Sequence, residues 1–336
     1  MNFDTDLIGA VVIGRNEGER LKACLNSLKS KITKIVYVDS GSTDDSAAFS
    51  KSINVDVVDL DTSIPFSAAR ARNEGLQQLT SLYPEIKFVQ FVDGDCQIAD
   101  DWIEFAYQSL VENPERAIVC GQRMEKFPNA SLYNLFCDIE WNTPVGEAGA
   151  CGGDFLGRVE ALQAVGGFNP SVIAGEEPEM CFRLREQGWK VFRLDHAMTH
   201  HDAQMHRFKQ WWMRAKRCGH AYAQGADMHG DSPEQYYRRE VKSAIVWGGV
   251  IPALLLVSLV STLLVPFWWV LGVWLLPCLL FLKVLKYAWR GKRLPFSKAL
   301  PYAASLVIAK LPEFSGVLEY YSRKRKKTAF SIIEYK

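Results

Sequence analysis

Three aspartates directly follow apolar segments that have the composition of buried strands. Asp93 and Asp95 follow residues 87–92 (KFVQFV), and Asp39 follows residues 34–38 (KIVYV). Mg²⁺ and Mn²⁺ need hard oxygen ligands and typically bind through one or two carboxylates together with a substrate phosphate. The sequence therefore predicts a site for a divalent cation, Mg²⁺ or Mn²⁺, after residues 87–92.

The segments that position these side chains alternate between predicted strands and predicted helices. Short apolar runs predict the strands, and apolar residues at helical spacing predict the helices. The strands are 7–14, 34–38, 54–58 and 87–92, and the helices are 19–28 and 68–79. This alternation indicates an open α/β sheet with parallel strands, which binds ligands at the carboxyl ends of its strands. Arg15, Asn16 and Glu17 follow the first strand and belong to the same set of strand-end residues.

Composition argues against several classes of protein. The formal net charge of the 336 residues is +1, so no global field suggests a nucleic-acid partner. The eight cysteines form no CxxC pair, which favours buried thiols in a reducing cytosol over a zinc site or a redox motif. The first ten residues lack the basic and apolar regions of a signal peptide, so none is expected.

Residues 243–282 contain no charged side chain. About 20 helical residues cross a hydrocarbon core of ~30 Å, and this run is about twice as long. Pro266 lies near its middle, which favours a helical hairpin over a single span. Lysines and arginines flank both ends and predict that both ends are cytoplasmic. A buried helix pair in a soluble protein is the alternative.

The chain is therefore expected to have three regions. They are an α/β domain at 1–240, a transmembrane hairpin at 243–282 and a basic region at 283–336. In the last region, residues 296–321 are apolar but interrupted by charges, which favours a helix lying in the membrane interface. Residues 323–327 (RKRKK) would contact anionic headgroups or remain solvated.

Five segments of the sequence resemble the motifs of one enzyme family and occur in the same order. The segments are VVIGRNEGERLKACLNSL, VYVDSGSTDDS, ARNEG, FVDGD and GEEPEMCFRLREQGW. This set resembles the family 2 glycosyltransferases with the GT-A fold, over roughly residues 7–220. The most similar members are bacterial enzymes of exopolysaccharide or lipid-linked glycan assembly. The resemblance implies a Rossmann-like domain with a mixed sheet that binds a nucleotide-sugar.

The resemblance also implies roles for the strand-end residues in holding this donor. Asp95 would bind the metal ion, with Asp93 near the ribose, and Asp39 would accept a hydrogen bond from the N–H of a uracil. Asp39 could instead stabilise the turn SGSTDD that follows it. Asn16 and Glu17 would hold the ribose or base, and Arg15 would meet a phosphate.

Other candidates come from helical and loop segments. Arg70 and Arg72 have i, i+2 spacing and cannot face the same way on a helix, so one faces the nucleotide and the other is a surface charge. Asp154, in a glycine-rich loop, could accept hydrogen bonds from sugar hydroxyls. Some GT-A enzymes use a late histidine as a further metal ligand; here His200 or His201 could do so, or both could be structural or exposed.

The catalytic base is expected in the segment Gly175–Glu179 (GEEPE). The family places its base at the second acidic position of a Glu-Asp pair that opens a helix, which matches Glu177 here, with Glu176 in support. Pro178 suits the first turn of a helix, and the helix dipole there favours an ionised carboxylate. Two ordinary capping acids are the alternative.

The function expected from these features is inverting transfer of a sugar from a nucleotide-diphospho-sugar, specifically a UDP-sugar. The acceptor would be a polyprenyl-diphosphate-linked glycan, because the hairpin keeps the enzyme in the plane of membrane lipid. The expected location is the inner membrane, with the catalytic domain cytoplasmic. The alternatives are glycosylation of a polyprenyl phosphate and a catalytically inactive, nucleotide-binding membrane scaffold.

Overall fold

The computed structural model describes residues 3–261 and 267–327, which form two compact units. The first unit ends at Gln204 and the second begins at Met205. This division lies earlier than the expected boundary at 240, because the helix that follows it packs against a helix near the C-terminus. Pro266, expected at the middle of the hairpin, lies outside the described residues.

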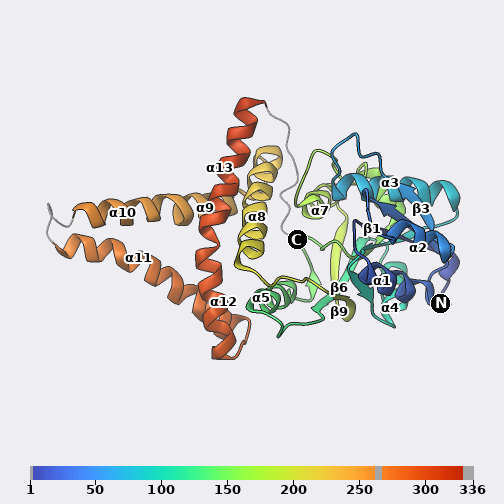
Figure 1. The fold of residues 1–336 in the computed structure, drawn as a ribbon, viewed down its shortest axis with the longest axis horizontal. Coiled ribbons are helices and arrows are strands. Elements are labelled where there is room, and N and C mark those ends of the chain that lie inside the picture. Colours follow the sequence, from blue (N-terminus) through green and yellow to red (C-terminus); the bar gives the residue numbers. More distant parts are fainter. Residues whose placement is uncertain (1–2, 262–266, 328–336) are drawn as a thin grey trace. The chain divides into compact units, whose positions relative to one another are not determined.

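The first unit is built on a mixed sheet (Figure 1). Its parallel part contains β1 (Ile8–Gly14), β2 (Lys34–Asp39), β3 (Asp56–Asp59) and β4 (Phe88–Asp93), in the order β3-β2-β1-β4. These strands confirm the four that the apolar runs predict, with β3 beginning two residues later than expected. The sheet is therefore parallel where the sequence alternates between strands and helices.

The sheet continues beyond β4 with strands that the sequence pattern did not predict. They are β5 (Cys96–Ile98), β6 (Arg116–Glu125), β7 (Gly146–Glu147), β8 (Phe155–Arg158) and β9 (Lys190–His201). β8 lies antiparallel between β4 and β6, and β6 pairs in parallel with β9. The two long strands β6 and β9 end together, since Glu125 is in register with His201. The glycine-rich loop expected at 149–157 ends at Asp154, because β8 begins at Phe155.

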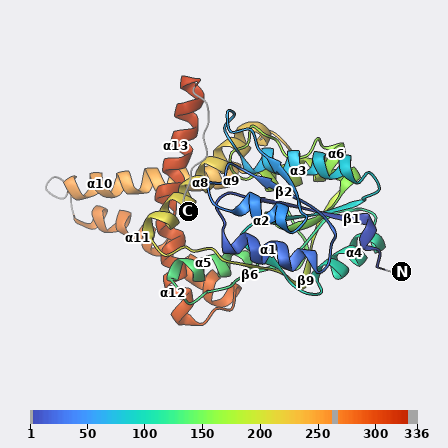
Figure 2. The same cartoon turned by 45° about the vertical axis from the view of Figure 1, so that its right-hand side comes forward.

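The helices of this unit have apolar faces that pack on the sheet. They are α1 (Glu19–Lys29), α2 (Ser46–Ser52), α3 (Ala68–Leu82), α4 (Trp102–Glu112), α5 (Leu132–Trp141), α6 (Val159–Ala164) and α7 (Glu176–Glu186). α1 shows the spacing clearly, because it buries Leu21, Cys24, Leu25 and Leu28. It runs beside α2 in both views (Figure 1, Figure 2). Ser67 caps α3 by accepting a hydrogen bond from the backbone N–H of Arg70.

The second unit is helical in its described part. It contains α8 (Phe208–His229), α9 (Arg238–Ile245), α10 (Ile251–Ser261), α11 (Phe267–Lys286), α12 (Phe296–Ile308) and α13 (Lys310–Lys326). The segment expected to form one interfacial helix, 296–321, thus belongs to two helices. Glycines let α8 and α13 approach closely: a Cβ at Gly219 would lie 1.9 Å from the carbonyl oxygen of Glu313. The Tyr320 hydroxyl also donates to Asp227 across this contact at 2.8 Å.

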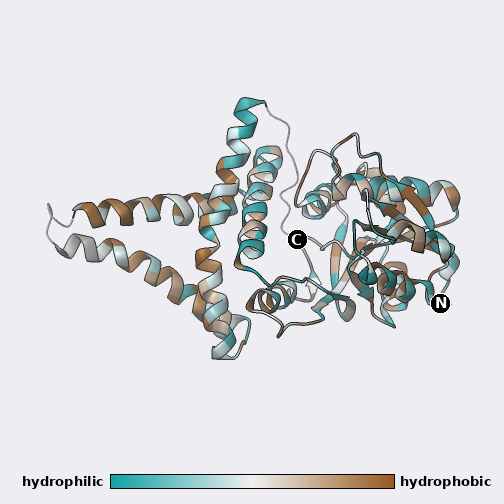
Figure 3. Ribbon diagram, viewed as in Figure 1, coloured by the Kyte–Doolittle hydropathy of each residue, from teal (hydrophilic) through white to brown (hydrophobic). Residues whose placement is uncertain are grey.

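Two helical stretches in this unit are long and apolar enough to cross a membrane, Arg238–Val260 and Gly272–Gly291. Only 17 % and 6 % of their apolar windows are buried, whereas the core helices of soluble proteins are mostly buried. Figure 3 shows the hydrophobic colouring along α10 and α11. The indole N–H of Trp274 donates to the Ser258 hydroxyl at 3.2 Å and links the two helices. These features are consistent with the expected hairpin.

Gly75 on α3 provides a test of the packing between this helix and the sheet. A Cβ at Gly75 would lie 2.4 Å from Val11 Cγ1 and 2.9 Å from Val38 Cγ2, and both valines are fully buried. Overpacking a filled core costs about 1–3 kcal/mol, and the better helix propensity of alanine offsets ~1 kcal/mol of it. A contact as short as 2.4 Å places this site in the upper part of that range, so Gly75→Ala should lower the free energy of unfolding by roughly 1–2 kcal/mol.

Chemical denaturation of the full chain in detergent measures this change. Gly149→Ala is the control, because a Cβ at Gly149 meets no atom within 4 Å. Equal stability of the two variants would contradict the described packing of α3.

Candidate active site

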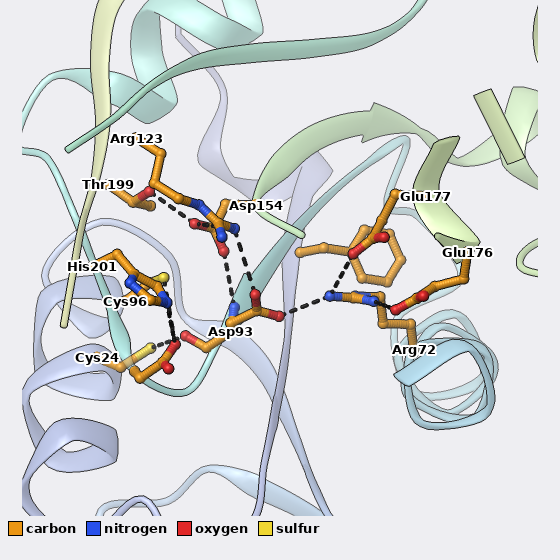
Figure 4. A network of polar contacts seen from close by, with 12 residues as sticks. Cys24, Arg72, Asp93, Cys96, Arg123, Asp154, Glu176, Glu177, Thr199 and His201 are labelled. Carbon is orange, nitrogen blue, oxygen red and sulfur yellow. Dashed lines mark hydrogen bonds and ion pairs between the residues drawn. The ribbon is translucent and has the colours of Figure 1, made fainter. Parts of the chain in front are cut away.

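Arg72 is the centre of a buried group of charges in the first unit (Figure 4). Its guanidinium lies 2.7 Å from Asp93 Oδ1, 2.9 Å from Glu176 Oε1 and 3.0 Å from Glu177 Oε1. Arg72 comes from α3, Asp93 from the end of β4, and the two glutamates from the start of α7. One side chain therefore joins the strand-end aspartate to both predicted catalytic acids.

A second arginine, Arg123 on β6, pairs with acids of this group on the far side of Asp93 from Arg72. It lies 2.8 Å from Asp154 Oδ2 and 3.5 Å from Asp93 Oδ2. Asp154 is fully buried and also accepts hydrogen bonds from the backbone N–H of Asp93 at 3.0 Å and the Thr199 hydroxyl at 2.8 Å. With these partners, Asp154 fixes the position of Asp93 at the end of β4.

The two arginines keep Asp93 ionised. Burial alone would raise the pKa of Asp93, but the charges of Arg72 and then Arg123 outweigh it and hold that pKa below its usual range. Burial likewise opposes the charge of Arg72, but Glu177, Asp93 and Glu176 outweigh it and raise the pKa of the guanidinium. The site is thus a set of paired charges, of which Arg72, Glu176 and Asp154 are buried and Asp93, Glu177 and Arg123 are partly exposed.

Glu177 is the exception in this group, since its pKa is raised to about 7. Burial is the largest cause, and repulsion from Glu176 adds to it, while Arg72 only partly opposes them. α7 begins at Glu176, after Gly175 in a left-handed conformation (φ 78°), so Pro178 lies in its first turn as predicted. The position at the start of a helix predicts that the dipole favours the ionised form of Glu177. Burial has the stronger effect and raises the pKa of Glu177 instead.

Of the two histidines considered as metal ligands, only one lies beside Asp95. His201 Nε2 lies 3.3 Å from Asp95 Oδ1, and both side chains are buried. His200, its neighbour on β9, is exposed and pairs in register with Gln97. Of the two late histidines, His201 is therefore the one beside Asp95.

The donor atoms of Asp95 and His201 suit a divalent cation. A carboxylate oxygen and an imidazole nitrogen are the ligand types that Mn²⁺ accepts, so these residues fit the expected ion. Cys96 Sγ is within 4.8 Å of both ligand atoms, but burial raises the pKa of its thiol well above the usual value. Burial lowers the pKa of His201, whereas Asp95 and Glu125 outweigh this and raise it. The fit thus rests on the Asp95 oxygen and the His201 nitrogen.

The residues after β1 and β2 form a connected edge of the sheet. Asp39 is buried and accepts hydrogen bonds from the Tyr37 hydroxyl (2.8 Å) and the backbone N–H groups of Gly41 (3.1 Å) and Ser42 (2.7 Å). The side-chain oxygen of Asn16 accepts from the backbone N–H of Thr43 at 2.7 Å. Asp39 and Asn16 therefore stabilise the turn after β2, which is the structural role considered for Asp39 from its sequence.

Two further candidates lie near this edge. Glu17 pairs with Arg20 at 2.6 Å, and its Cγ would lie 3.3 Å from a Cβ placed on Gly94, so Glu17 flanks the Asp93–Asp95 segment. The guanidinium carbon of Arg15 lies 4.7 Å from the centre of the Phe66 ring. Both side chains thus belong to the carboxyl edge of the parallel strands.

Arg70 does not join the buried group. It pairs with Glu74 at 2.9 Å and donates to the carbonyl oxygen of Ile64 at 3.0 Å. Arg70 and Arg72 therefore face different ways on α3, as their spacing requires.

The sequence did not single out Arg123, Glu125 or Thr199. Arg123 and Glu125 have i, i+2 spacing at the end of β6, so their side chains share one face of the strand. A sequence signal could have identified these two residues: they are polar, two positions apart, and follow the apolar run at 117–120.

Two family models match the sequence. The model described as "Glycosyl transferase family 2" matches residues 10–162, and that described as "Glycosyl transferase family group 2" matches residues 149–288. Together they span both the sheet of the first unit and the apolar helices that follow.

Individual relatives are distant. The chain is 23 % identical over 268 residues to the pre-mycofactocin glycosyltransferase of Mycobacterium tuberculosis, in two strains, covering 75 % of this chain. It spans about half the length of these curated relatives, 53 %. A mannosyltransferase from Pyrobaculum calidifontis, solved with GDP-Man and Mn²⁺, has a TM-score of 0.60 and 16 % identity, covering 92 % of this chain and 87 % of that chain. This similarity supports the predicted GT-A fold.

Replacing Arg72 tests whether the buried charges depend on it. Removing one partner of a buried ion pair costs about 3–5 kcal/mol, whereas a partly exposed pair contributes about 0–1 kcal/mol. Arg72→Met should therefore lower the free energy of unfolding at pH 8 far more than Arg70→Met, measured by denaturation of the full chain in detergent.

This difference should narrow at pH 5, because the carboxylates left without Arg72 then take up protons. A loss for Arg72→Met that is independent of pH, or equal to that of Arg70→Met, would contradict the ion-pair account.

Proposed function

Because this chain belongs to the family 2 glycosyltransferases, we propose that it transfers a sugar from a nucleotide-diphospho-sugar to a lipid-linked acceptor. The observation that carries the proposal is the grouping of Glu177 and Asp93 around Arg72, with the pair of Asp95 and His201 beginning two residues after Asp93. The reaction requires a base with a pKa near neutrality and side chains that can hold a divalent cation with the donor diphosphate.

The acceptor hydroxyl must lose a proton as it attacks the anomeric carbon. In this proposal Glu177 accepts that proton, the new bond forms between the anomeric carbon and the acceptor oxygen, and the bond to the nucleoside diphosphate breaks. A single displacement of this kind inverts the anomeric centre. With a pKa of about 7, Glu177 combines a substantial ionised fraction with useful basicity at neutral pH. Glu176 supports it by raising that pKa and by pairing with Arg72.

Asp95 and His201 would hold a divalent cation with the donor diphosphate. The ion, when bound, would offset the charge that develops on the departing diphosphate. Asp93, whose side chain is partly exposed, is proposed to face the ribose. Asp154 was expected to meet the sugar hydroxyls, but it is fully buried and its oxygens are engaged by Asp93, Thr199 and Arg123. Its proposed role is therefore to hold Asp93 in place.

The nucleotide is proposed to lie along the edge formed by Arg15, Asn16, Glu17 and Asp39. A carboxylate can accept about four hydrogen bonds. Asp39 uses three of them, one from the Tyr37 hydroxyl in β2 and two from the turn, which leaves capacity for one N–H of a uracil and supports a UDP-sugar as the donor. Arg15 would meet a phosphate. Arg70 is left out of the donor site, since its partners lie within α3 and at Ile64.

A lipid-linked acceptor is proposed because of the exposed apolar helices α10 and α11. Side chains such as Leu256, Val260 and Leu275 are at least 58 % exposed, and burying them in hydrocarbon would be favourable. A polyprenyl-diphosphate-linked glycan would then share the plane of the inner membrane with the enzyme. The basic flanks of this segment favour both ends and the catalytic domain on the cytoplasmic side.

Asp95→Ala tests the requirement for a metal ion. Loss of a ligand that offsets transition-state charge should cost several kcal/mol, or about 10²–10³-fold in kcat. Transfer should also stop when EDTA is present in excess, and it should return with Mn²⁺ or Mg²⁺.

Asp100→Ala is the control, because Asp100 is an exposed acid outside the group. Full turnover of the wild type in EDTA would refute metal dependence.

Glu177→Gln tests the base, since glutamine keeps the size of the side chain but cannot take the proton. Its kcat should fall by about 10²–10⁴-fold with little change in the affinity for the donor. In the wild type, kcat/KM should rise as pH increases through about 7, because only ionised Glu177 acts as a base, and it should level off above this pH.

The matched variant is Glu176→Gln, which should retain the greater part of its turnover and shift the rise in kcat/KM to lower pH. If Glu177→Gln keeps its turnover while Glu176→Gln loses it, the roles of the two glutamates are reversed.

A further inference from the structure

Glu125 is a fully buried carboxylate at the end of β6, and the mechanism above does not use it. Its Oε1 accepts hydrogen bonds from the backbone N–H of Phe127 at 3.0 Å and from Asn134 Nδ2 at 3.1 Å. Its Oε2 accepts from the backbone N–H of Ala203 at 3.1 Å. Three donors therefore fix the orientation of this carboxylate.

The same carboxylate faces the imidazole of His201. Glu125 and His201 are opposite each other in the parallel register of β6 and β9, and Glu125 Oε2 lies 3.6 Å from His201 Nδ1. His201 Nδ1 has no hydrogen-bond partner among the described residues, while Nε2 on the other side of the ring is 3.3 Å from Asp95. The ring of Trp141 packs edge-on against the imidazole, with centroids 4.6 Å apart. The imidazole thus lies between two carboxylates, with its Nε2 edge toward Asp95.

We propose that Glu125 is a positioning residue that holds the Nδ1–H of His201, so that the Nε2 lone pair is directed at a divalent cation shared with Asp95. The proposal rests on the metal-dependent function above and assigns to it a residue outside the sequence motifs. Glu125 acts through His201 and does not touch the ion.

The physical reason is the choice between two tautomers of neutral histidine. A metal ion needs a nitrogen lone pair, and a neutral imidazole has one only on the nitrogen that carries no proton. A fixed carboxylate beside Nδ1 stabilises the proton there and leaves Nε2 for the metal. Because three donors from the protein hold Glu125, the carboxylate is in place beside Nδ1 before any ion binds.

Glu125 could instead serve only to anchor the chain around Phe127, Asn134 and Ala203. A double-mutant cycle separates the two roles, because residues that act through one another are not additive. The cycle uses the full chain in detergent with the single variants Glu125→Gln and His201→Ala and the double variant. The readout is Mn²⁺ affinity, measured by the loss of the free-ion EPR signal with and without UDP.

Glu125→Gln keeps the volume and part of the hydrogen bonding, but removes the negative charge beside Nδ1. Its amide nitrogen replaces either Oε2, where it faces His201 Nδ1 and the N–H of Ala203, or Oε1, where it faces the donors of Phe127 and Asn134. Mn²⁺ affinity should fall by about 10–100-fold when His201 is present. In the His201→Ala chain, the same change should alter affinity by no more than about 2-fold. Glu115→Gln, at an exposed position just before β6, should leave affinity unchanged.

Two results would overturn the proposal alone: wild-type affinity in Glu125→Gln, or an equal loss with and without His201. A wild-type chain that binds no Mn²⁺ in either condition would overturn the metal-dependent function together with it. If Glu125→Gln does not fold, as judged by circular dichroism, Glu125→Asp takes its place in the cycle. It keeps the charge but withdraws the carboxylate by one methylene, and its loss of affinity should again depend on His201.

Discussion

The carboxylates around Asp93 are largely buried, and Arg72 and Arg123 balance their charges. Taking an ion out of water costs several kcal/mol unless close partners compensate, so the elements that carry these side chains must meet accurately. α3 supplies one arginine and β6 the other, while β4 and α7 supply acids. The close approach of α3 to the sheet at Gly75 therefore matters for the site as well as for the core.

The positive charges do not fully compensate the negative ones, and the proposed chemistry depends on this difference. Arg72 carries one positive charge but lies within 3.0 Å of Asp93, Glu176 and Glu177. Two of these acids come from adjacent positions in α7, so their repulsion adds to burial and raises the pKa of Glu177 to about 7. Asp93, which also meets Arg123, has a lowered pKa instead. The same network thus lowers the pKa of one acid, Asp93, and raises that of another, Glu177, to about 7, where it could exchange protons near neutral pH.

Local sequence patterns were sufficient for the parallel strands, for the aspartates at their ends and for the start of α7, because each depends on neighbouring residues. They were insufficient for the pairing of β6 with β9, which brings Glu125 to His201 across 76 positions of sequence. The partners of Arg72 are likewise distant, since Glu176 is 104 positions away. The choice of His201 over His200 also depends on tertiary structure, because a strand turns adjacent side chains to opposite faces.

The proposed reaction is tested most directly by incubating the detergent-solubilised chain with Mn²⁺, a panel of radiolabelled UDP-, GDP- and dTDP-sugars and a bacterial lipid extract. The account predicts that one nucleotide-sugar, expected among the UDP-sugars, transfers its label to material that extracts into organic solvent. The anomeric configuration of the new bond should be opposite to that of the donor. Binding of a nucleotide-sugar without transfer to any lipid, or transfer with retention, would contradict the account.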